Sequence, residues 1–447
     1  MTQESGMKAS GFPGPKSTFP FWRTELHSLD EHRTTEELPN KIDVLIIGAG
    51  YAGITTAYHL LEGKNSPPSI AIFEARQICS GATGRNGGHL RPSVSDENVI
   101  QQHGLEAAAE VALFEMAHVQ AIKDLVEKEQ IDCDLSIARA NHVVLDKEYA
   151  AAVGQLLNLL QQSRREFLQD WEYIEGPKAE EVSGVKGAQG CFSLSAGQLW
   201  PYKLFTHLLE IVVAKGVNLQ TNTPVSSVAK AQDLEGYWQV QTPRGVTRAK
   251  KLVFATNGYT SAILPQYTGI IYPVRGICTR IKTPEDQPAP KLSHTYCINF
   301  GQGWDYLIQR GDGSIVVGGG KSSYLADRFQ WCNNVDDGSL IEPARSYFDG
   351  YMQRNFMGWE QSGAYVDQIW TGIQGYTSDS LPHFGSVPGV VDQFVAAGFN
   401  GHGMPVIFLA TKGIAKMILE GKSFEETGVP KIFKTTNERL RQGNLHS

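Results

Sequence analysis

The chain has 447 residues, of which 41% are hydrophobic and 19% are charged, and its formal net charge is −7 at neutral pH. This length exceeds one ordinary core and predicts two or three domains, while the composition excludes disordered and fibrous proteins. The charges are spread along the chain without a basic block, so a nucleic acid is not an expected partner.

The apolar runs are too short to cross a bilayer, and the six cysteines lie far apart without a Cys-x-x-Cys pair. We therefore expect a soluble protein with no membrane contact, no metal site and no disulfide framework, in a reducing compartment. The N-terminus has no signal-peptide pattern and the C-terminus is not the peroxisomal tripeptide, so the expected location is the cytoplasm.

Residues 1–40 are rich in Pro, Ser and charged residues and show no sustained period. This composition predicts a leader that is at best partly ordered. Within it, Phe19-Pro20-Phe21-Trp22 could pack onto the folded body as an aromatic anchor, and an exposed tail is the alternative.

A buried strand, a glycine-rich turn and a helix are predicted over residues 41–60, where an apolar run is broken by Gly48-x-Gly50-x-x-Gly53. In this motif Gly48 permits the turn, Gly50 lets the backbone approach a pyrophosphate, and Gly53 lets the helix pack on the strand. A second apolar strand ends in Glu74, whose carboxylate would accept the hydroxyls of a ribose. These features predict a dinucleotide site. A glycine-rich turn with a chance acidic residue is the alternative.

Small residues dominate the next stretch, residues 79–92, which cannot build a core. Small residues permit close approach of the backbone to a flat ligand. Ser80, Thr83 and Asn86 would offer it short hydrogen-bonding groups.

Amphipathic helices are predicted over residues 105–127 and 150–160, with a loosely alternating strand at 137–145 between them. These pieces interrupt the nucleotide-binding pattern and indicate an inserted layer that covers the cofactor and shapes a pocket. A helix at 202–215 and a strand at 217–225 then resume that pattern.

A hairpin is predicted from strands 237–240 and 245–249, followed by a further buried strand at 251–258 that ends in a glycine turn. From 270 to 370 the pattern is that of β-structure, and Asp312-Gly313 between two apolar runs is a hairpin signal. We expect an antiparallel sheet there, the floor of a second domain.

The last predicted unit is a strand at 394–397, a glycine turn at 398–403 and a helix at 404–419. Pro405 falls in the first turn of this helix, where its missing N–H has no intrahelical partner.

Taken together, these motifs resemble the D-amino-acid oxidase family of flavoproteins, over roughly residues 41–425. The unit from Gly48 to Glu74 is similar to the family's FAD-binding start. Residues 82–88 are similar to the γ-glutamylputrescine oxidase branch, beside sarcosine oxidase and glycine oxidase.

Two further segments carry the resemblance. Residues 223–225 and 255–258 are similar to the family's second FAD-binding segment, and residues 398–403 to its closing flavin loop. The resemblance implies FAD as cofactor, rather than NAD. It also implies an α/β fold, α+β overall, with a Rossmann-like FAD-binding domain and a second, mainly antiparallel substrate domain.

The expected domain division follows the switch between these patterns. It assigns 1–40 to the leader, 41–97, 198–265 and 372–430 to the FAD-binding domain, 98–197 and 266–371 to the substrate domain, and 431–447 to a tail.

The residues expected to bind the cofactor come from these motifs. They are Gly48, Gly50, Tyr51, Ala52, Gly53, Glu74, Ala75, Arg76, Ser80, Ala82, Thr83, Arg85, Asn86, Gly87, Gly88, His89, Leu90, Val225, Ala255, Thr256, Asn257, Gly258, Gly398, Asn400, Gly401, His402, Gly403 and Met404.

Two positions depart from the sarcosine oxidase pattern. Gln374 stands where that enzyme has its flavin-linking cysteine, so the resemblance implies noncovalent FAD at this position. Val316 stands where it has the lysine that assists the reaction with oxygen. Use of another electron acceptor therefore stays open.

Five residues are candidates for catalysis. His89 and Arg91 could reach the flavin or a substrate carboxylate, or belong to an ordinary turn. Arg275 could hold an anionic substrate by a bidentate contact, or be a surface charge on a strand. Lys321 could replace the missing lysine, or be a solvated turn residue, and His402 could be catalytic or support the backbone.

The implied activity is FAD-dependent oxidation of a C–N bond in a small amine or amino acid, by hydride transfer to the flavin. The imine would then hydrolyse, and oxygen would reoxidise the flavin. One alternative is a flavin dehydrogenase or biosynthetic oxidase that acts on a bulkier metabolite. Another is a dinucleotide-binding sensor without turnover.

Overall fold

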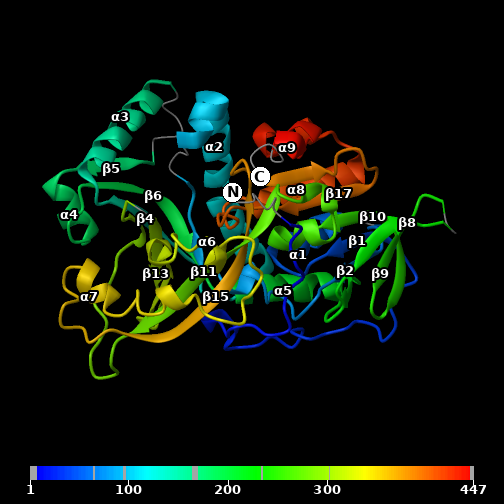
Figure 1. Cartoon of the computed structure of the whole chain (residues 1–447), viewed down its shortest axis with the longest axis horizontal. Coiled ribbons are helices and arrows are strands. Elements are labelled where there is room, and N and C mark those ends of the chain that lie inside the picture. The colour runs from blue at the N-terminus through cyan, green and yellow to red at the C-terminus, as the bar shows by residue number, and fades with distance from the viewer. Residues whose placement is uncertain are drawn as a thin grey trace, which may run out of the picture.

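The computed structural model contains two β-sheets that lie side by side, with a long helix between them (Figure 1). The structure describes residues 8–63, 66–93, 97–163, 170–232, 235–301 and 303–442. Within these ranges no helix is both long and apolar enough to span a membrane.

The first sheet has the strand order β16-β17-β10-β1-β2-β7, and β9 and β8 extend from β10. The pairs that join β17, β10, β1, β2 and β7 are parallel. Its strands are β1 (Lys41–Ile47), β2 (Ile70–Phe73), β7 (Asn218–Gln220), β8 (Ser227–Lys230), β9 (Trp238–Thr242), β10 (Gly245–Phe254), β16 (His383–Ser386) and β17 (Gln393–Ala397).

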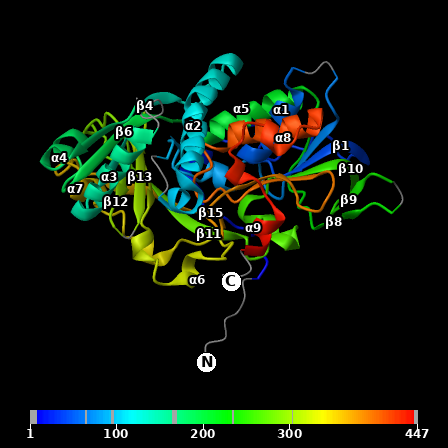
Figure 2. The same cartoon turned by 90° about the horizontal axis from the view of Figure 1, so that it is seen from above.

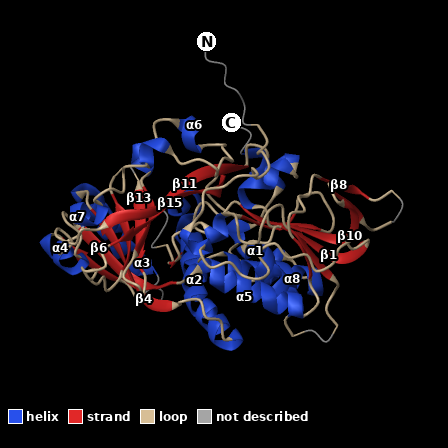
Figure 3. Cartoon of the chain, turned by 90° about the horizontal axis from the view of Figure 1, so that it is seen from below, coloured by secondary structure: helices blue, strands red, loops and turns tan. Residues whose placement is uncertain are grey.

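Both faces of this sheet are buried, which explains the apolar run Val44–Ile47 in its first strand. Val44 and Ile46 belong to the cluster shared with helices α1 (Tyr51–Leu61), α5 (Pro201–Ala214) and α8 (Ile407–Glu420). Leu45 and Ile47 belong to a separate cluster. Figure 3 shows the three helices gathered on one side of the sheet.

The second sheet has the order β15-β11-β14-β13-β12-β4-β6-β3, with β5 beside β6. Its pairs are antiparallel except for β12 with β4, so the expectation of a mainly antiparallel sheet is confirmed. Its strands are β3 (His89–Leu90), β4 (Ser136–Val144), β5 (Glu172–Glu175), β6 (Gly190–Gln198), β11 (Ile271–Lys282), β12 (Thr295–Asn299), β13 (Trp304–Gln309), β14 (Ile315–Gly319) and β15 (Tyr365–Thr377).

Helices α3 (Lys147–Ser163), α4 (Pro177–Ser183) and α7 (Tyr351–Asn355) lie at the second sheet, and α2 (Glu97–Glu129) lies between the two sheets (Figure 2). The longest, α2, is interrupted at Gly104, which has φ +82°. The remaining α-helices are α6 (Arg328–Trp331) and α9 (Asn437–Gln442). The 3₁₀ helices are η1 (Phe21–Arg23), η2 (Ala82–Gly84), η4 (Asn257–Ala262), η5 (Pro265–Tyr267), η6 (Lys321–Ser323), η7 (Glu342–Ala344), η8 (Phe424–Glu426) and η9 (Lys431–Phe433).

Several predicted element boundaries are wrong. The strand predicted at 217–225 is only the short strand β7 (Asn218–Gln220). The stretches 245–249 and 251–254 form the single strand β10, because its first half pairs with β9 while its second half pairs with β1 and β17. The helix predicted at 404–419 begins at Ile407, because Val406 has φ −127°, outside the helical region. Pro405 therefore precedes the helix. The predicted hairpin around Asp312-Gly313 is confirmed as β13 and β14.

The N-terminal segment differs from the expected leader. Phe21 and Trp22 are buried, and the Trp22 ring lies edge-on to Trp200 with centroids 5.7 Å apart. Phe19 is exposed. The aromatic anchor therefore consists of Phe21 and Trp22. Residues 8–40 lie against the folded body. The division of the remaining chain into domains stays a proposal, since β15 crosses the expected boundary at residue 372.

Candidate active site

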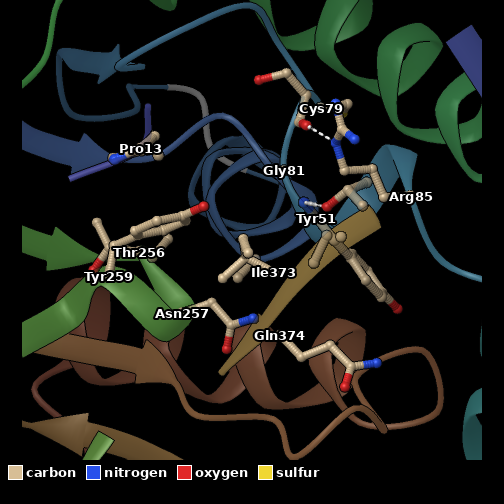
Figure 4. A pocket seen from close by; sticks show the side chains of 18 of the residues that line it. Pro13, Tyr51, Cys79, Gly81, Arg85, Thr256, Asn257, Tyr259, Ile373 and Gln374 are labelled. Atoms are coloured by element: carbon tan, nitrogen blue, oxygen red, sulfur yellow. Dashed lines mark hydrogen bonds between the residues drawn. The ribbon is translucent and has the colours of Figure 1, made fainter. Parts of the chain in front are cut away.

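A cavity lies at the carboxyl ends of the parallel strands, where ligands bind in open α/β sheets. Its walls come from the turn after β1, the end of β2, the small-residue stretch, the end of β10, β15 and the glycine turn before α8. Figure 4 shows this cavity with the labelled side chains around it. We call it the cofactor cavity.

The three motif glycines differ in what surrounds them. Gly48 has φ +112°, and a Cβ there would lie 2.6 Å from the Ala255 carbonyl oxygen. A Cβ on Gly53 would overlap the carbonyl oxygen of Gly48, so the helix can approach the turn only without a side chain. A Cβ on Gly50 would meet Thr83 Oγ1 at 3.0 Å. The geometry agrees with the roles that the motif predicts for Gly48 and Gly53.

Glu74 lines the cavity at the end of β2, as the ribose carboxylate of the motif should. Its Oε2 accepts a hydrogen bond from the Ala49 N–H at 2.8 Å, and its Oε1 accepts one from the Arg76 N–H at 2.9 Å. The carboxylate thus also braces the glycine turn.

We predict that Glu74→Ala weakens FAD binding by roughly tenfold or more, because it removes a charged acceptor worth about 1.5–3 kcal/mol. Titration of apo-protein with FAD measures the effect. Glu74→Gln is the matched control, since an amide oxygen retains one acceptor but no charge. Equal FAD affinity of all three proteins would remove Glu74 from the site.

The small-residue stretch is organised by its own side chains. Thr83 Oγ1 accepts from the Tyr51 N–H at 2.9 Å, and Asn86 Nδ2 donates to the Thr83 carbonyl at 2.9 Å. Arg85 is buried and donates to the carbonyls of Ser80 and Thr371. Burial lowers the pKa of Arg85 to about 10. Thr83, Asn86 and Arg85 therefore hold this wall in place.

The later segments that are predicted to bind FAD are joined to one another by hydrogen bonds. Asn257 Oδ1 accepts from the N–H groups of Gly398 and Phe399, at 3.1 and 3.3 Å. Asn400 Oδ1 accepts from the Thr377 N–H at 2.8 Å. These amides join η4, β15 and the glycine turn into one wall.

The structure sorts the predicted cofactor residues into three groups. Those that line the cofactor cavity are Gly48, Gly50, Tyr51, Ala52, Glu74, Ala75, Arg76, Ser80, Ala82, Thr83, Arg85, Asn86, Val225, Ala255, Thr256, Asn257, Gly401, Gly403 and Met404. Those that line a second cavity, described next, and not the cofactor cavity are Gly87, His89, Asn400 and His402. Those that line neither are Gly53, Gly88, Leu90, Gly258 and Gly398. The glycine cradle and the carboxylate at its edge fit a bound dinucleotide.

A second cavity of about 700 Å³ adjoins the first, and Asn86, Gly276, Tyr306, Gln374 and Gly401 are among the residues that line both. It lies between the second sheet, α3 and the loop 319–325. The five residues predicted to be catalytic, far apart in sequence, all line it: His89, Arg91, Arg275, Lys321 and His402. We call it the substrate cavity.

The charged side chains that line the substrate cavity are all positive among the described residues. Among the described residues that line it, Arg91, Arg275 and Lys321 are cationic, and none is Asp or Glu. Apolar side chains from α3 and the second sheet, including Val153 and Phe192, cover another part of the wall. The cavity therefore favours a ligand with a negative charge and an apolar part.

The two arginines are used differently. The terminal nitrogens of Arg275 already donate to the carbonyls of Gln330 and Ser339, at 3.0 and 2.7 Å. Arg91 Nη1 donates to the Pro92 carbonyl at 3.0 Å and contacts His142 Nε2. Of the two, Arg91 has the more available guanidinium within the described part of the chain. The predicted bidentate grip thus suits Arg91 better than Arg275.

Lys321 lies in an aromatic setting. Its Nζ is 4.8 Å from the centre of the Trp331 ring and 5.5 Å from that of Tyr376. Burial lowers its pKa from the ordinary value. Lys321 is thus not the freely solvated turn lysine that the alternative supposed.

Three histidines, His89, His142 and His402, also line the substrate cavity, and Glu115 contacts His402 without lining the cavity itself. His89 Nε2 lies 2.6 Å from Thr295 Oγ1, and His402 Nε2 lies 2.9 Å from Glu115 Oε2. Burial and, after it, the charge of Arg91 hold the pKa values of His89 and His142 well below the ordinary range. Burial raises the pKa of Glu115, but His402 and the Ser93 N–H outweigh this effect and leave it lowered.

Sequence reasoning missed His142 and Glu115, whereas Tyr306, Trp370 and Tyr376 are aromatic residues that the sequence predicts either to line a pocket or to belong to the core, and Tyr306 and Tyr376 line a cavity. His142 lies within a strand and Glu115 within a helix, and no local pattern distinguishes either from structural residues. Tyr306 lines both cavities, and a Cβ on Gly87 or Gly318 would overlap its ring. These glycines therefore flank an aromatic wall between the cavities. Trp370, in contrast, is fully buried and donates to the Arg85 carbonyl.

Comparison with known proteins gives a consistent picture. The model of the family described as "DAO: FAD dependent oxidoreductase" matches residues 43–417. Gamma-glutamylputrescine oxidoreductase of Escherichia coli is 24% identical over 382 residues, covering 84% of this chain and 83% of that protein. Glycine oxidase of Bacillus licheniformis is 23% identical over 386 residues, covering 85% of this chain and 93% of that protein.

Solved structures show the same fold. Glycine oxidase from Geobacillus kaustophilus superposes with a TM-score of 0.67 at 20% identity, covering 86% of this chain and 96% of that one. L-proline dehydrogenase from P. horikoshii superposes with a TM-score of 0.68 at 20% identity, covering 89% and 98%. The two-sheet architecture is thus shared with these proteins.

Proposed function

Since the chain belongs to the DAO family of FAD-dependent oxidoreductases, we propose that it oxidises the C–N bond of a small amine or amino acid that carries a carboxylate. The observation that carries this proposal is the substrate cavity, whose described lining has three cationic side chains and no acidic one. A carboxylate would be paired there, whereas a dicationic amine would meet like charges.

In this proposal each part of the cavity lining has its own role in catalysis. Bound FAD supplies the acceptor for a hydride from the carbon beside nitrogen. Arg91 holds the substrate carboxylate, and Val153 and Phe192 contact the apolar part and exclude water. Tyr306, fixed between Gly87 and Gly318, sets the wall against which the reacting carbon lies. Hydrolysis of the imine and reoxidation by oxygen complete the proposed cycle.

The test is an anaerobic screen of the FAD-loaded protein. Amino acids are compared with the amines that lack their carboxylate, and loss of the flavin absorbance reports reduction. We expect bleaching by a subset of amino acids and slower bleaching by the matched amines. Absence of bleaching by both the amino acids and the amines would favour the alternative of a dinucleotide-binding sensor without turnover. Oxygen uptake during turnover would identify oxygen as the electron acceptor.

We predict that the rate of reduction rises with pH along the titration of the substrate amine, because only the neutral amine has a lone pair to assist hydride loss. His89 and His142 should add no inflection near neutral pH, since their lowered pKa values keep both rings uncharged there. Anaerobic rapid mixing with two substrates of different amine pKa provides the measurement. An identical midpoint for both substrates would contradict this prediction.

A further inference from the structure

The family match begins at residue 43, so the segment that precedes it lies outside the matched region. Part of that segment, residues 10–18, runs along the cofactor cavity. Phe12 and Pro13 line the cavity together with Glu74. Figure 4 shows Pro13 on the same side of the cavity as Tyr259. We call residues 10–18 the strap.

Hydrogen bonds fasten both ends of the strap. The Ser10 N–H donates at 2.9 Å to the Oγ of Ser261, which belongs to η4, the segment that also contains Tyr259. At the other end, the Thr18 N–H donates to the Asp337 carbonyl at 2.6 Å, and Thr18 Oγ1 accepts from the Thr371 N–H at 3.0 Å. The strap is thus fixed to elements on either side of the cavity.

A buried ion pair supports the middle of the strap. The terminal nitrogens of Arg76 donate to the two carboxylate oxygens of Asp337, at 3.0 and 2.9 Å, and Arg76 Nη1 also donates to the Gly14 carbonyl at 3.3 Å. The Asp337 side chain is 1% exposed. Arg76 directly follows the motif residues Glu74 and Ala75, so one side chain connects the nucleotide motif to the strap.

The same wall contains the Tyr259 hydroxyl, for which no hydrogen-bond partner is found among the described residues. This hydroxyl is buried. Tyr259 lines the cavity with Pro13 and Arg76. A buried hydroxyl without a hydrogen-bond partner is unfavourable, so this position suits a ligand that supplies a partner.

We propose that the strap is part of the FAD site: Phe12 and Pro13 close the cavity on the side of Glu74, and FAD leaves only when the strap detaches. The closed wall excludes water from the cofactor and holds it beside Tyr259. This inference depends on FAD as cofactor and not on the proposed amine substrate, since release of FAD is measured without substrate.

The experiment compares FAD release from three holoproteins after dilution, followed by the fluorescence of free flavin. One is the full chain, one lacks residues 1–16, and the matched control lacks residues 1–7 and keeps every contact given above. We expect release from the chain without residues 1–16 to be at least about tenfold faster, because affinity changes act mostly on dissociation. The control should release FAD at the rate of the full chain.

A double variant, Phe12→Ala with Pro13→Gly, keeps the strap's hydrogen bonds but removes its contact surface, and it should also release FAD faster. If the chain without residues 1–16 does not fold, the FAD release rate of the double variant tests the proposal. A strap that only stabilises the protein would lower the thermal midpoints of the apo- and holoproteins equally and leave the release rates unchanged. That result overturns the proposal.

Discussion

Replacing Gly53 by alanine is expected to abolish FAD binding in the purified protein. The added Cβ would overlap the carbonyl oxygen of Gly48, which belongs to the backbone and cannot turn aside as a flexible side chain could. Helix α1 would have to move away from the turn, at about 3 kcal/mol for such overpacking. The turn, the Ala49 N–H that donates to Glu74 and the first residues of the helix would then lose their shared geometry.

The measurement is the ratio of flavin to protein absorbance after purification, with the thermal unfolding midpoint of the apo-protein. Gly311→Ala is the matched control, because a Cβ at Gly311 would meet nothing within 4 Å and its φ is not positive. The control should retain full FAD. A Gly53→Ala protein with normal flavin content would show that α1 can move away from the turn at a small cost in free energy. The close packing of α1 against the turn would then not be required for FAD binding.

The glycine motif could be predicted from the sequence because its parts are neighbours along the chain. Gly48, Gly53 and Glu74 belong to consecutive elements, and a strand, a turn and a helix leave few ways to arrange them. The same holds for the hairpin at Asp312-Gly313. In each case the structure follows from local backbone preferences and one short-range pairing.

The substrate cavity could be predicted only in part. His89 and Arg91 follow the stretch of small residues, and His402 lies between two glycines. The three residues meet in one cavity. Their partners are distant in sequence, as with His402 and Glu115, which are 287 positions apart. No periodicity signals such a pair. For the same reason, sequence could not show that the Arg275 guanidinium donates to the distant carbonyls of Gln330 and Ser339.

Composition misled the reading of the N-terminal segment. A stretch rich in Pro, Ser and charge lacks the apolar face that a helix or strand needs, and residues 8–40 contain only the short helix η1. Order comes instead from single contacts with distant elements, such as those of Ser10, Thr18 and Trp22. The pattern of hydrophobic and polar residues along the chain does not reveal such contacts.

Arg91→Leu is the variant expected to have the largest effect on substrate selection. A charge-assisted hydrogen bond to a carboxylate is worth about 1.5–3 kcal/mol, so kcat/KM for an amino-acid substrate should fall roughly 10- to 100-fold. The matched amine without the carboxylate never used that contact, and its kcat/KM should change little. Steady-state kinetics on both substrates with each protein provides the comparison.

Two controls separate recognition from general damage. Arg345→Leu changes an arginine whose side chain is 66% exposed, and it should leave both substrates unaffected. Arg275→Leu removes the donors to the Gln330 and Ser339 carbonyls, so it should lower the thermal midpoint and impair both substrates alike. Equal losses on the acid and the amine in Arg91→Leu would mean that Arg91 shapes the cavity without contacting a carboxylate. The cationic lining would then have to act through Lys321, whose Nζ lies against Trp331 and Tyr376, and Lys321→Met would be the variant that discriminates between the two substrates.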